Sequence, residues 1–229
     1  MSLLHPSLMF SITVQGVTGV IEFLSLFVPT APGMKLIKQL LGLEVAVQTI
    51  EGIFYVWLYN NFRAVKNITP KRYIDWVLTT PTMLILLVSY IIYFNANANN
   101  RDALSLIQIL RENAVTIAQI IGLNWLMLLF GYLGEVGAIP LVAGIAVGFL
   151  PFIAYFYIIY ERFIDSANPN NDIGLKFYAY FLVFWSLYGI AAVLPYALKN
   201  TIYNVIDLFS KNLLGVYSSY LLISSAWMM

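Results

Sequence analysis

The sequence predicts an all-α membrane protein, a bundle of seven transmembrane helices that forms a single domain over residues 1–229. Two observations support this prediction. Hydrophobic residues make up 61% of the chain and charged residues only 10%, whereas a soluble domain carries about 25% charged residues. Seven apolar stretches are also long enough for a helix to cross a ~30 Å hydrocarbon layer, which takes roughly 20 residues. The lipid bilayer is therefore the expected surroundings of the chain.

Short polar or Pro/Gly-bearing breaks divide these stretches. The predicted spans are residues 7–28, 35–59, 70–94, 112–133, 137–160, 174–198 and 201–226. The breaks are Pro29–Gly33, Asn60–Thr69, Asn95–Asp102, Gly134–Gly137, Glu161–Asp172 and a tight turn at Lys199-Asn200. The first stretch lacks the basic flank and small-residue cleavage site of a signal peptide, so we expect it to be retained.

Prolines mark one helix start and interrupt other spans. Thr69 followed by Pro70 predicts an N-cap and the first helical residue of the third span. Membrane helices tolerate internal prolines because neighbouring side chains and packed helices satisfy the freed carbonyl groups. The prolines predicted to lie within spans are Pro81, Pro151 and Pro195.

Basic residues are divided unequally between the two ends of the predicted bundle. One end carries Lys35, Lys38, Arg101, Arg111, Arg162 and Lys176. The other carries Arg63, Lys66, Lys71 and Lys199. Because basic residues gather on the cytoplasmic side, this excess predicts an extracellular N-terminus and a cytoplasmic C-terminus.

Composition also excludes several kinds of site. The chain has no cysteine, which rules out disulfides and thiolate chemistry. Its one histidine, His5, lies near the N-terminus and is predicted to be a surface residue, so we expect no metal site. A net charge of +1 without a basic cluster argues against a nucleic-acid partner.

Charged residues inside the predicted spans indicate a functional site. A lysine at the centre of a membrane helix costs about 2.5–3.5 kcal/mol, and Lys211 occupies such a position. Five of the eleven acidic residues also fall within spans: Glu22, Glu44, Glu51, Asp75 and Asp207.

Helical spacing groups these charges. Asp207 and Lys211 are four residues apart and share a helix face, as do Arg72, Asp75 and Thr79 on the third span. We expect Lys211 to lie between the two aspartates, with Arg72 balancing Asp207. Two carboxylates near an amine or iminium favour its protonated form. The alternative is a buried ion-pair network that only locks two helices together.

Aromatic residues at the same depth predict a flat apolar slot beside the lysine: Tyr73, Trp76, Trp185 and Tyr188. Three motifs then resemble the microbial rhodopsins. Arg72–Pro81 is similar to their third-helix motif, Trp185–Tyr188 to the sixth-helix part of their retinal pocket, and Asp207–Lys211 to their seventh-helix motif. The resemblance covers all seven spans in order.

The resemblance implies a cofactor and residue roles. Lys211 binds all-trans-retinal covalently as a Schiff base, with Asp75 and Asp207 as counterions and proton acceptor. Arg72 organises the outer half-channel. The implied retinal pocket contains Tyr73, Trp76, Thr79, Thr80, Asn124, Met127, Trp185, Tyr188 and Gly189.

A polar stripe on the second span resembles channelrhodopsins. Glu44, Gln48 and Glu51 are spaced i, i+4 and i+7, and Asn212 follows the lysine, where channelrhodopsins place a gate residue. A first-span partner for this gate would be Ser11 or Gln15. Acidic rows favour cations, so the stripe predicts a cation path. The alternative is a polar seam of protonated glutamates.

The sequence therefore predicts a photoreceptor, not an enzyme, that acts as a light-gated channel for monovalent cations or protons. The first alternative is an outward light-driven proton pump, which would be slow because Leu86 stands where pumps carry a proton-donating carboxylate. The second is a photosensor. Members of the family form dimers, trimers or pentamers, so the resemblance leaves a homo-oligomer open.

Overall fold

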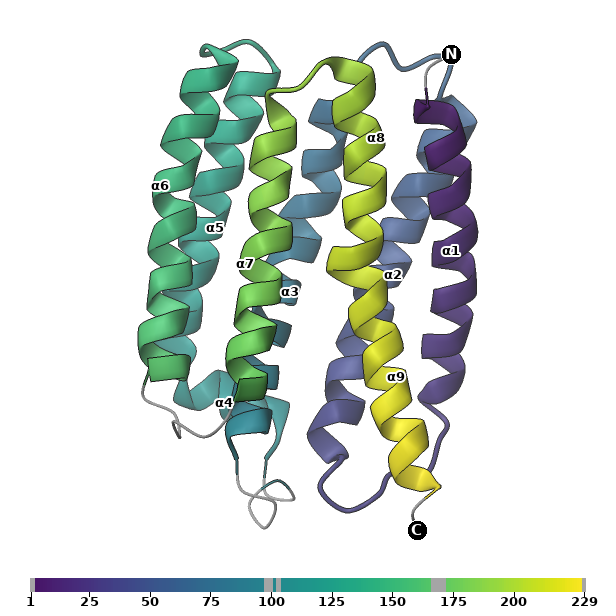
Figure 1. The fold of residues 1–229 in the computed structure, drawn as a ribbon, viewed down its shortest axis with the longest axis vertical. Helices are drawn as coiled ribbons and strands as arrows, with labels where there is room; N and C mark the ends of the chain where they lie inside the picture. The colour runs from purple at the N-terminus through teal and green to yellow at the C-terminus, as the bar shows by residue number, and fades with distance from the viewer. Residues whose placement is uncertain (1–2, 97–100, 102–103, 166–171, 228–229) are drawn as a thin grey trace.

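The computed structural model of the chain describes residues 3–96, 101, 104–165 and 172–227 and contains no strand within them. Its helices pack side by side as an elongated bundle (Figure 1). The α-helices are α1 Leu4–Ser25, α2 Lys35–Asn61, α3 Thr69–Asn95, α4 Leu106–Glu112, α5 Ala114–Glu135, α6 Leu141–Ile159, α7 Asp172–Ala192, α8 Tyr196–Asp207 and α9 Leu213–Ala226. Two π-helical segments, η2 Tyr160–Asp165 and η3 Leu208–Asn212, extend α6 and join α8 to α9.

The bundle consists of seven spans, as predicted. Six single helices in the described part of the chain are long and apolar enough to cross a membrane. The seventh span is composite, because α8, η3 and α9 continue one another as a single rod beside α1 (Figure 1). The odd number of spans puts the two termini at opposite ends of the bundle (Figure 1).

The predicted turn at Lys199-Asn200 is wrong. The break between the sixth and seventh spans falls at residues 193–195, and α8 begins at Tyr196 after Pro195. Pro195 is thus a helix boundary rather than an internal proline, because it lacks the N–H that a continuing helix requires. Lys199 and Asn200 lie buried inside α8, where Lys199 Nζ pairs with Glu135 Oε1 of α5 at 2.7 Å. Both polar side chains make contacts with other helices. The sequence pattern does not distinguish polar residues of this kind from those of a solvated turn.

Other predicted boundaries move by smaller amounts. Helix α3 begins at Thr69 itself, so Thr69 is not the N-cap, and its hydroxyl instead accepts a hydrogen bond from Asn200 Nδ2 at 2.9 Å. The fourth span begins at Ala114 after the separate helix α4. The break predicted from Glu161 begins later, because η2 continues the fifth span to Asp165. Residues 97–100, 102 and 166–171 of the predicted breaks lie outside the described residues.

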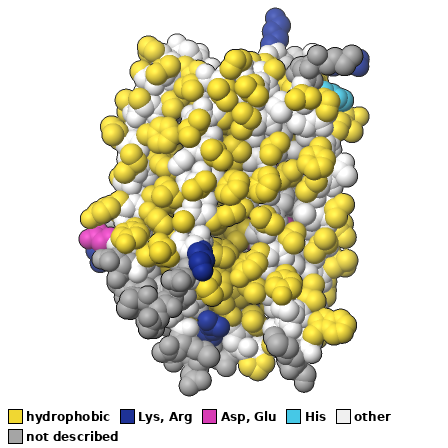
Figure 2. All heavy atoms as spheres, in the orientation of Figure 1, with side chains coloured by type: hydrophobic (Ala, Val, Ile, Leu, Met, Phe, Trp, Pro, Cys, Tyr) yellow, Lys and Arg dark blue, Asp and Glu magenta, His cyan; other side chains and the backbone are white. Residues whose placement is uncertain are grey.

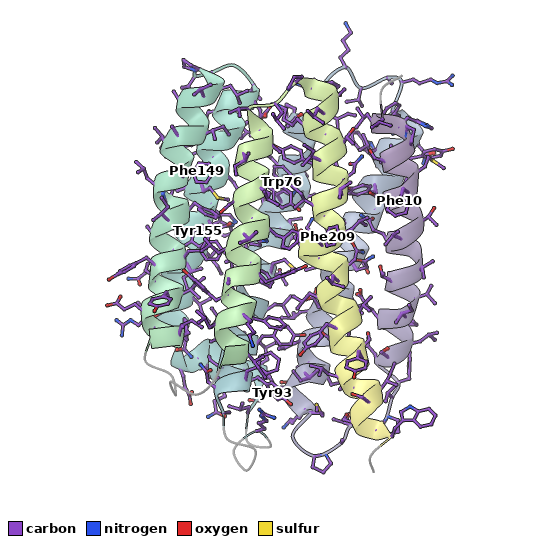
Figure 3. The ribbon with its side chains drawn as sticks, viewed as in Figure 1. Phe10, Trp76, Tyr93, Phe149, Tyr155 and Phe209 are labelled. Atoms are coloured by element: carbon purple, nitrogen blue, oxygen red, sulfur yellow. The ribbon has the colours of Figure 1, made fainter. Side chains whose placement is uncertain are left out.

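The surface and the interior differ in the way that a membrane requires. Hydrophobic side chains cover most of the face in Figure 2, and only a few charged side chains are visible on it. Phe10 on α1 is 60% exposed, whereas Trp76 of α3 lies in the middle of the bundle (Figure 3). His5 is exposed, as predicted.

Pro81 illustrates how the bundle satisfies a carbonyl group freed by proline. Without an N–H at Pro81, the carbonyl of Val77 loses its usual helical partner. The indole Nε1 of Trp125 on α5 donates to that oxygen at 3.1 Å. A neighbouring helix therefore supplies the missing hydrogen bond, and α3 continues to Asn95.

Close packing of α5 against α6 depends on Gly144. A Cβ added there would lie 2.7 Å from the backbone oxygen of Phe130, whereas a Cβ at Gly122 on the same α5 meets nothing within 4 Å. We predict that Gly144→Ala lowers the unfolding free energy by about 1–3 kcal/mol, the usual cost of overpacking. Thermal unfolding in detergent, followed by circular dichroism, measures this change. Gly122→Ala is the control and should be neutral or slightly stabilising, and equal midpoints for the two variants would contradict the packing argument.

Candidate functional site

The centre of the bundle contains a buried ammonium surrounded by three carboxyl groups. Lys211 Nζ lies 3.0 Å from Asp75 Oδ2, 3.3 Å from Glu51 Oε1 and 3.7 Å from Asp207 Oδ1. All four residues are at most 4% exposed. The structure thus places Lys211 between the two aspartates and adds Glu51, which the sequence analysis assigned only to the ion path.

The backbone around Lys211 is irregular. Lys211 lies on η3, whose π-helical turn carries one more residue per hydrogen-bonded loop than an α-helix. Such turns are rare and are frequently found at functional sites. Tyr188 Oη, from α7, donates to Asp207 Oδ1 at 2.6 Å and lies 2.7 Å from Ser210 Oγ, which ties this turn to the sixth span.

A dense hydrogen-bond network surrounds the carboxylate of Asp207. Arg72 Nη1 pairs with Asp207 Oδ2 at 3.2 Å, and the guanidinium also donates to the side-chain oxygens of Asn200 and Asn204. Tyr55 Oη donates to Asp207 Oδ2 at 2.5 Å. Both oxygens of Asp207 therefore have donors, and Arg72 balances its charge as expected.

Three members of this network, Tyr55, Asn200 and Asn204, have no role in the site predicted from the sequence. Asn200, Asn204, Asp207 and Lys211 follow one another at i, i+4, i+7 and i+11, a polar stripe that helical spacing makes visible. Tyr55 extends the Glu44–Glu51 stripe by one turn. The stripe from Asn200 to Lys211 is not recognised when Asn200 is placed in a turn between two spans.

A cluster of amide side chains lies around Asn212, the residue that follows Lys211. Asn212 Nδ2 donates to Gln48 Oε1 at 2.8 Å and to Thr18 Oγ1 at 2.9 Å. Gln48 Nε2 donates to the backbone oxygen of Gln15 at 2.7 Å. Ser11 lies elsewhere, and its hydroxyl donates to the backbone oxygen of Asn204 at 2.8 Å. The first-span hydroxyl beside Asn212 is thus Thr18, a residue that carries no distinctive signal in the sequence.

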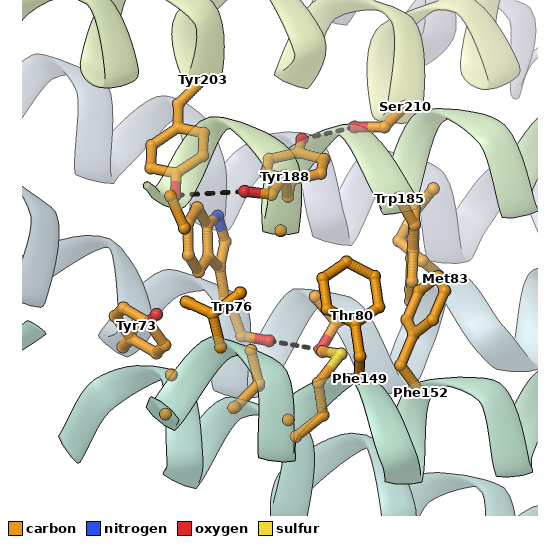
Figure 4. Close-up of a pocket in the computed structure, with 18 of the residues that line it drawn as sticks. Tyr73, Trp76, Thr80, Met83, Phe149, Phe152, Trp185, Tyr188, Tyr203 and Ser210 are labelled. Carbon is orange, nitrogen blue, oxygen red and sulfur yellow. Dashed lines mark hydrogen bonds between the residues drawn. The ribbon is translucent and has the colours of Figure 1, made fainter. Parts of the chain in front are cut away.

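An apolar cavity lies on the other side of Lys211, between α3, α5, α6 and α7. Trp76 and Trp185 flank it in Figure 4, and Lys211 and Ser210 lie among its lining residues. Seven predicted pocket residues line it: Tyr73, Trp76, Thr80, Met127, Trp185, Tyr188 and Gly189. Its other large lining side chains are Met83, Phe149, Phe152 and Tyr203 (Figure 4), which the sequence did not mark.

Two predicted pocket residues are not among those that line the cavity. Asn124 Nδ2 donates to Thr80 Oγ1 at 2.7 Å and so supports a lining residue. Thr79 Oγ1 donates to the backbone oxygen of Asp75 at 3.0 Å. Gly189 does line the cavity, and a Cβ there would come within 2.5 Å of the Phe149 ring. Gly189 therefore allows Phe149 to form the cavity wall.

Comparison with known proteins places the chain in a family. The sequence profile of the family described as "Bacteriorhodopsin-like protein" matches residues 7–225. The chain belongs to this family of microbial rhodopsins. A green-light absorbing proteorhodopsin from the gamma-proteobacterium EBAC31A08 is 26% identical over a match covering 73% of this chain and 68% of the relative. Members of the family are membrane photoreceptors that generally bind retinal through a lysine.

Solved structures support the same assignment. The chain superposes on the viral rhodopsin OLPVRII with a TM-score of 0.80 and 29% identity, covering 97% of this chain and 98% of that one. It shares its fold with the proton pumping rhodopsin AR2 of the marine alga Acetabularia acetabulum, with a TM-score of 0.71 and 16% identity over 100% and 98% of the two chains.

The charge network predicts a large effect of removing Arg72. Arg72→Gln removes the nearer of the two cations that pair with the buried Asp207 carboxylate and leaves Lys211 Nζ at 3.7 Å, and breaking a buried pair costs about 3–5 kcal/mol. We expect a marked fall in the thermal unfolding midpoint. Arg63→Gln removes an exposed arginine and serves as the control. Similar midpoints for the two variants would show that Arg72 does not stabilise the bundle.

Proposed function

We propose that this rhodopsin is a light-gated cation channel whose path follows α1, α2, η3 and α9. The observation that supports the proposal is a row of buried polar atoms that have no hydrogen-bond partner among the described residues. They are Asp75 Oδ1, Glu51 Oε2, Asn212 Oδ1, Glu44 Oε1, Glu22 Oε1 and both side-chain polar atoms of Gln15. Buried polar groups are rarely left unpaired, so such a row suits water molecules or passing cations.

The residues present fit a covalently bound retinal. Lys211 supplies the amine, and the adjoining cavity has the aromatic lining that a flat polyene requires. Lys211 would hold all-trans-retinal, with Trp76 and Trp185 on either side. When bound, the retinal supplies light absorption and a change of shape against these side chains.

Asp75 is the better placed of the two aspartates to accept a proton from Lys211 Nζ. Asp75 Oδ2 is 3.0 Å away, and its other oxygen has no partner among the described residues. Asp207 is 3.7 Å from Nζ, and hydrogen bonds from Arg72, Tyr55 and Tyr188 stabilise its anion. Asp207 thus acts as the fixed counterion and Asp75 as the proton acceptor.

The acidic groups along the path determine whether cations or anions can pass. Glu51 and Glu44 lie on one face of α2, and rows of acidic groups favour cations and repel anions. Arg72 with its partners closes the outer half of the path, and the contacts of Asn212 with Gln48 and Thr18 close the inner half. Opening requires both sets of contacts to break.

An outward proton pump is the second candidate. The short distance from Lys211 Nζ to Asp75 supports this function equally well. A proton transferred from Nζ to Asp75 moves toward the outer end of the bundle. Leu86, however, is fully buried in the apolar core on the inner side of α3. It offers no proton to return to Nζ, so we expect pumping to be slow.

The correction at Lys199 increases the charge difference from which the orientation is predicted. Lys199 is buried in an ion pair and no longer counts as a loop residue, which leaves six basic residues at the inner end against three at the outer end. We therefore propose that the N-terminus is extracellular and the C-terminus cytoplasmic.

Illuminated, voltage-clamped cells test the channel. We expect a photocurrent that reverses with the cation gradient, whereas a pump current keeps one direction. Glu51→Gln should lower the current per absorbed photon, or change the cation permeability ratio, several-fold because it removes an acidic group from the path. Glu161→Gln changes an exposed glutamate and is the matched control. A unidirectional current, or a Glu51→Gln current identical to that of the control, would contradict the channel.

A further inference from the structure

Glu22 is a buried acid that contributes an unpaired oxygen to the row described above but has no role of its own in the proposed path. It lies on α1, is 1% exposed, and its Oε1 has no hydrogen-bond partner among the described residues. Neither Glu22 nor Glu44 makes an ion pair with a basic side chain in the described part of the chain. An isolated buried carboxylate is costly. The group therefore needs a proton or a cation.

Gly215 on α9 provides the space for the Glu22 carboxyl group. A Cβ at Gly215 would lie 2.2 Å from the Glu22 carboxyl carbon. Any other residue at this position would displace the carboxyl group from the interface between α1 and α9. Ser219, one turn further along the same face of α9, is buried, and its hydroxyl has no partner among the described residues.

Glu22 continues the amide cluster by one helical turn. The side chains of Thr18, Gln48 and Asn212 contact one another. One helical turn further inward, α1 carries Glu22 and α2 carries Glu44. These two carboxyl groups are close enough to repel each other when ionised. The row of unpaired polar atoms therefore extends inward from Asn212 to a pair of acids.

The groups that interact with this pair in the described part of the chain carry no positive charge, and one of them, Glu51 of α2, is a third acid that acts on Glu44. Tyr90 of α3 interacts electrostatically with both glutamates, and its hydroxyl is hydrogen-bonded to Ser218 Oγ of α9. Tyr217, also on α9, is a further titratable group that interacts with Tyr90. Hydroxyl groups can solvate a proton or a partly dehydrated cation, but they do not balance a carboxylate.

The geometry points to Glu22 as a second inner acid of the ion path, which holds a proton while the path is closed and exchanges it for a monovalent metal cation when the path opens. The proton passes from the Glu22 carboxyl to water at the inner end, and the cation then balances the carboxylate. This inference rests on the proposed channel function and adds a residue that sets the preference for metal cations over protons.

Two measurements on Glu22→Gln test the inference. The permeability ratio of Na⁺ to H⁺, taken from reversal potentials, should fall at least twofold, because the amide cannot balance a metal cation. The light-minus-dark infrared spectrum should lose one band in the carboxylic acid C=O region. Glu112→Gln changes an exposed glutamate on α4 and should alter neither. An unchanged permeability ratio or an unchanged infrared spectrum in Glu22→Gln overturns the inference.

A second variant tests the position of the carboxyl group. Gly215→Ala should displace Glu22 and lower the permeability ratio in the same direction, whereas Gly16→Ala, where a Cβ meets nothing within 4 Å, should not. If Glu22→Gln does not fold, Glu22→Asp keeps the acid and should shift the infrared band, and an unshifted band overturns the inference. A unidirectional current in the unmodified protein contradicts the channel alone. The infrared band then still decides whether Glu22 holds a proton that responds to light.

Discussion

The rest of this structure depends on one constraint: the positive charge of an ammonium group buried inside a membrane must be balanced by negative charge. Lys211 contacts carboxyl groups from α2, α3 and α8, so its charge holds together helices that are far apart in the sequence. A lysine at this depth is costly unless it is paired, and breaking such a pair costs more than making it gains. Arg72, Tyr55 and Asn200 follow from the same constraint, because they hold the second carboxylate in place.

Lys211 also separates two different environments. The apolar cavity lies on its α5–α6–α7 side, and the polar seam with its unpaired atoms lies on its α1–α2 side. A change of shape in the cavity therefore acts directly on Lys211, whose contacts with Glu51 and Asp75 lie at the start of the polar seam. Under the proposed channel function, this arrangement connects light absorption to the ion path.

Much of this was visible in the sequence because membrane helices leave strong signals. Hydropathy located the seven spans, and the spacing of Asp207 and Lys211 located the centre of the site. Contacts between spans were not visible. Lys199 was assigned to a turn because a buried lysine paired with Glu135 has the same local pattern as a solvated one. Thr18 and Gly215 matter only through the side chains that they meet on other helices.

The visible absorption spectrum of the purified protein, produced with all-trans-retinal present, tests the central claim most directly. The account predicts a coloured protein that is bleached by hydroxylamine in light, a colourless Lys211→Ala variant, and an unchanged spectrum for Lys176→Ala, which alters an exposed lysine on α7. A colourless unmodified protein, or a pigment that survives Lys211→Ala, would contradict it.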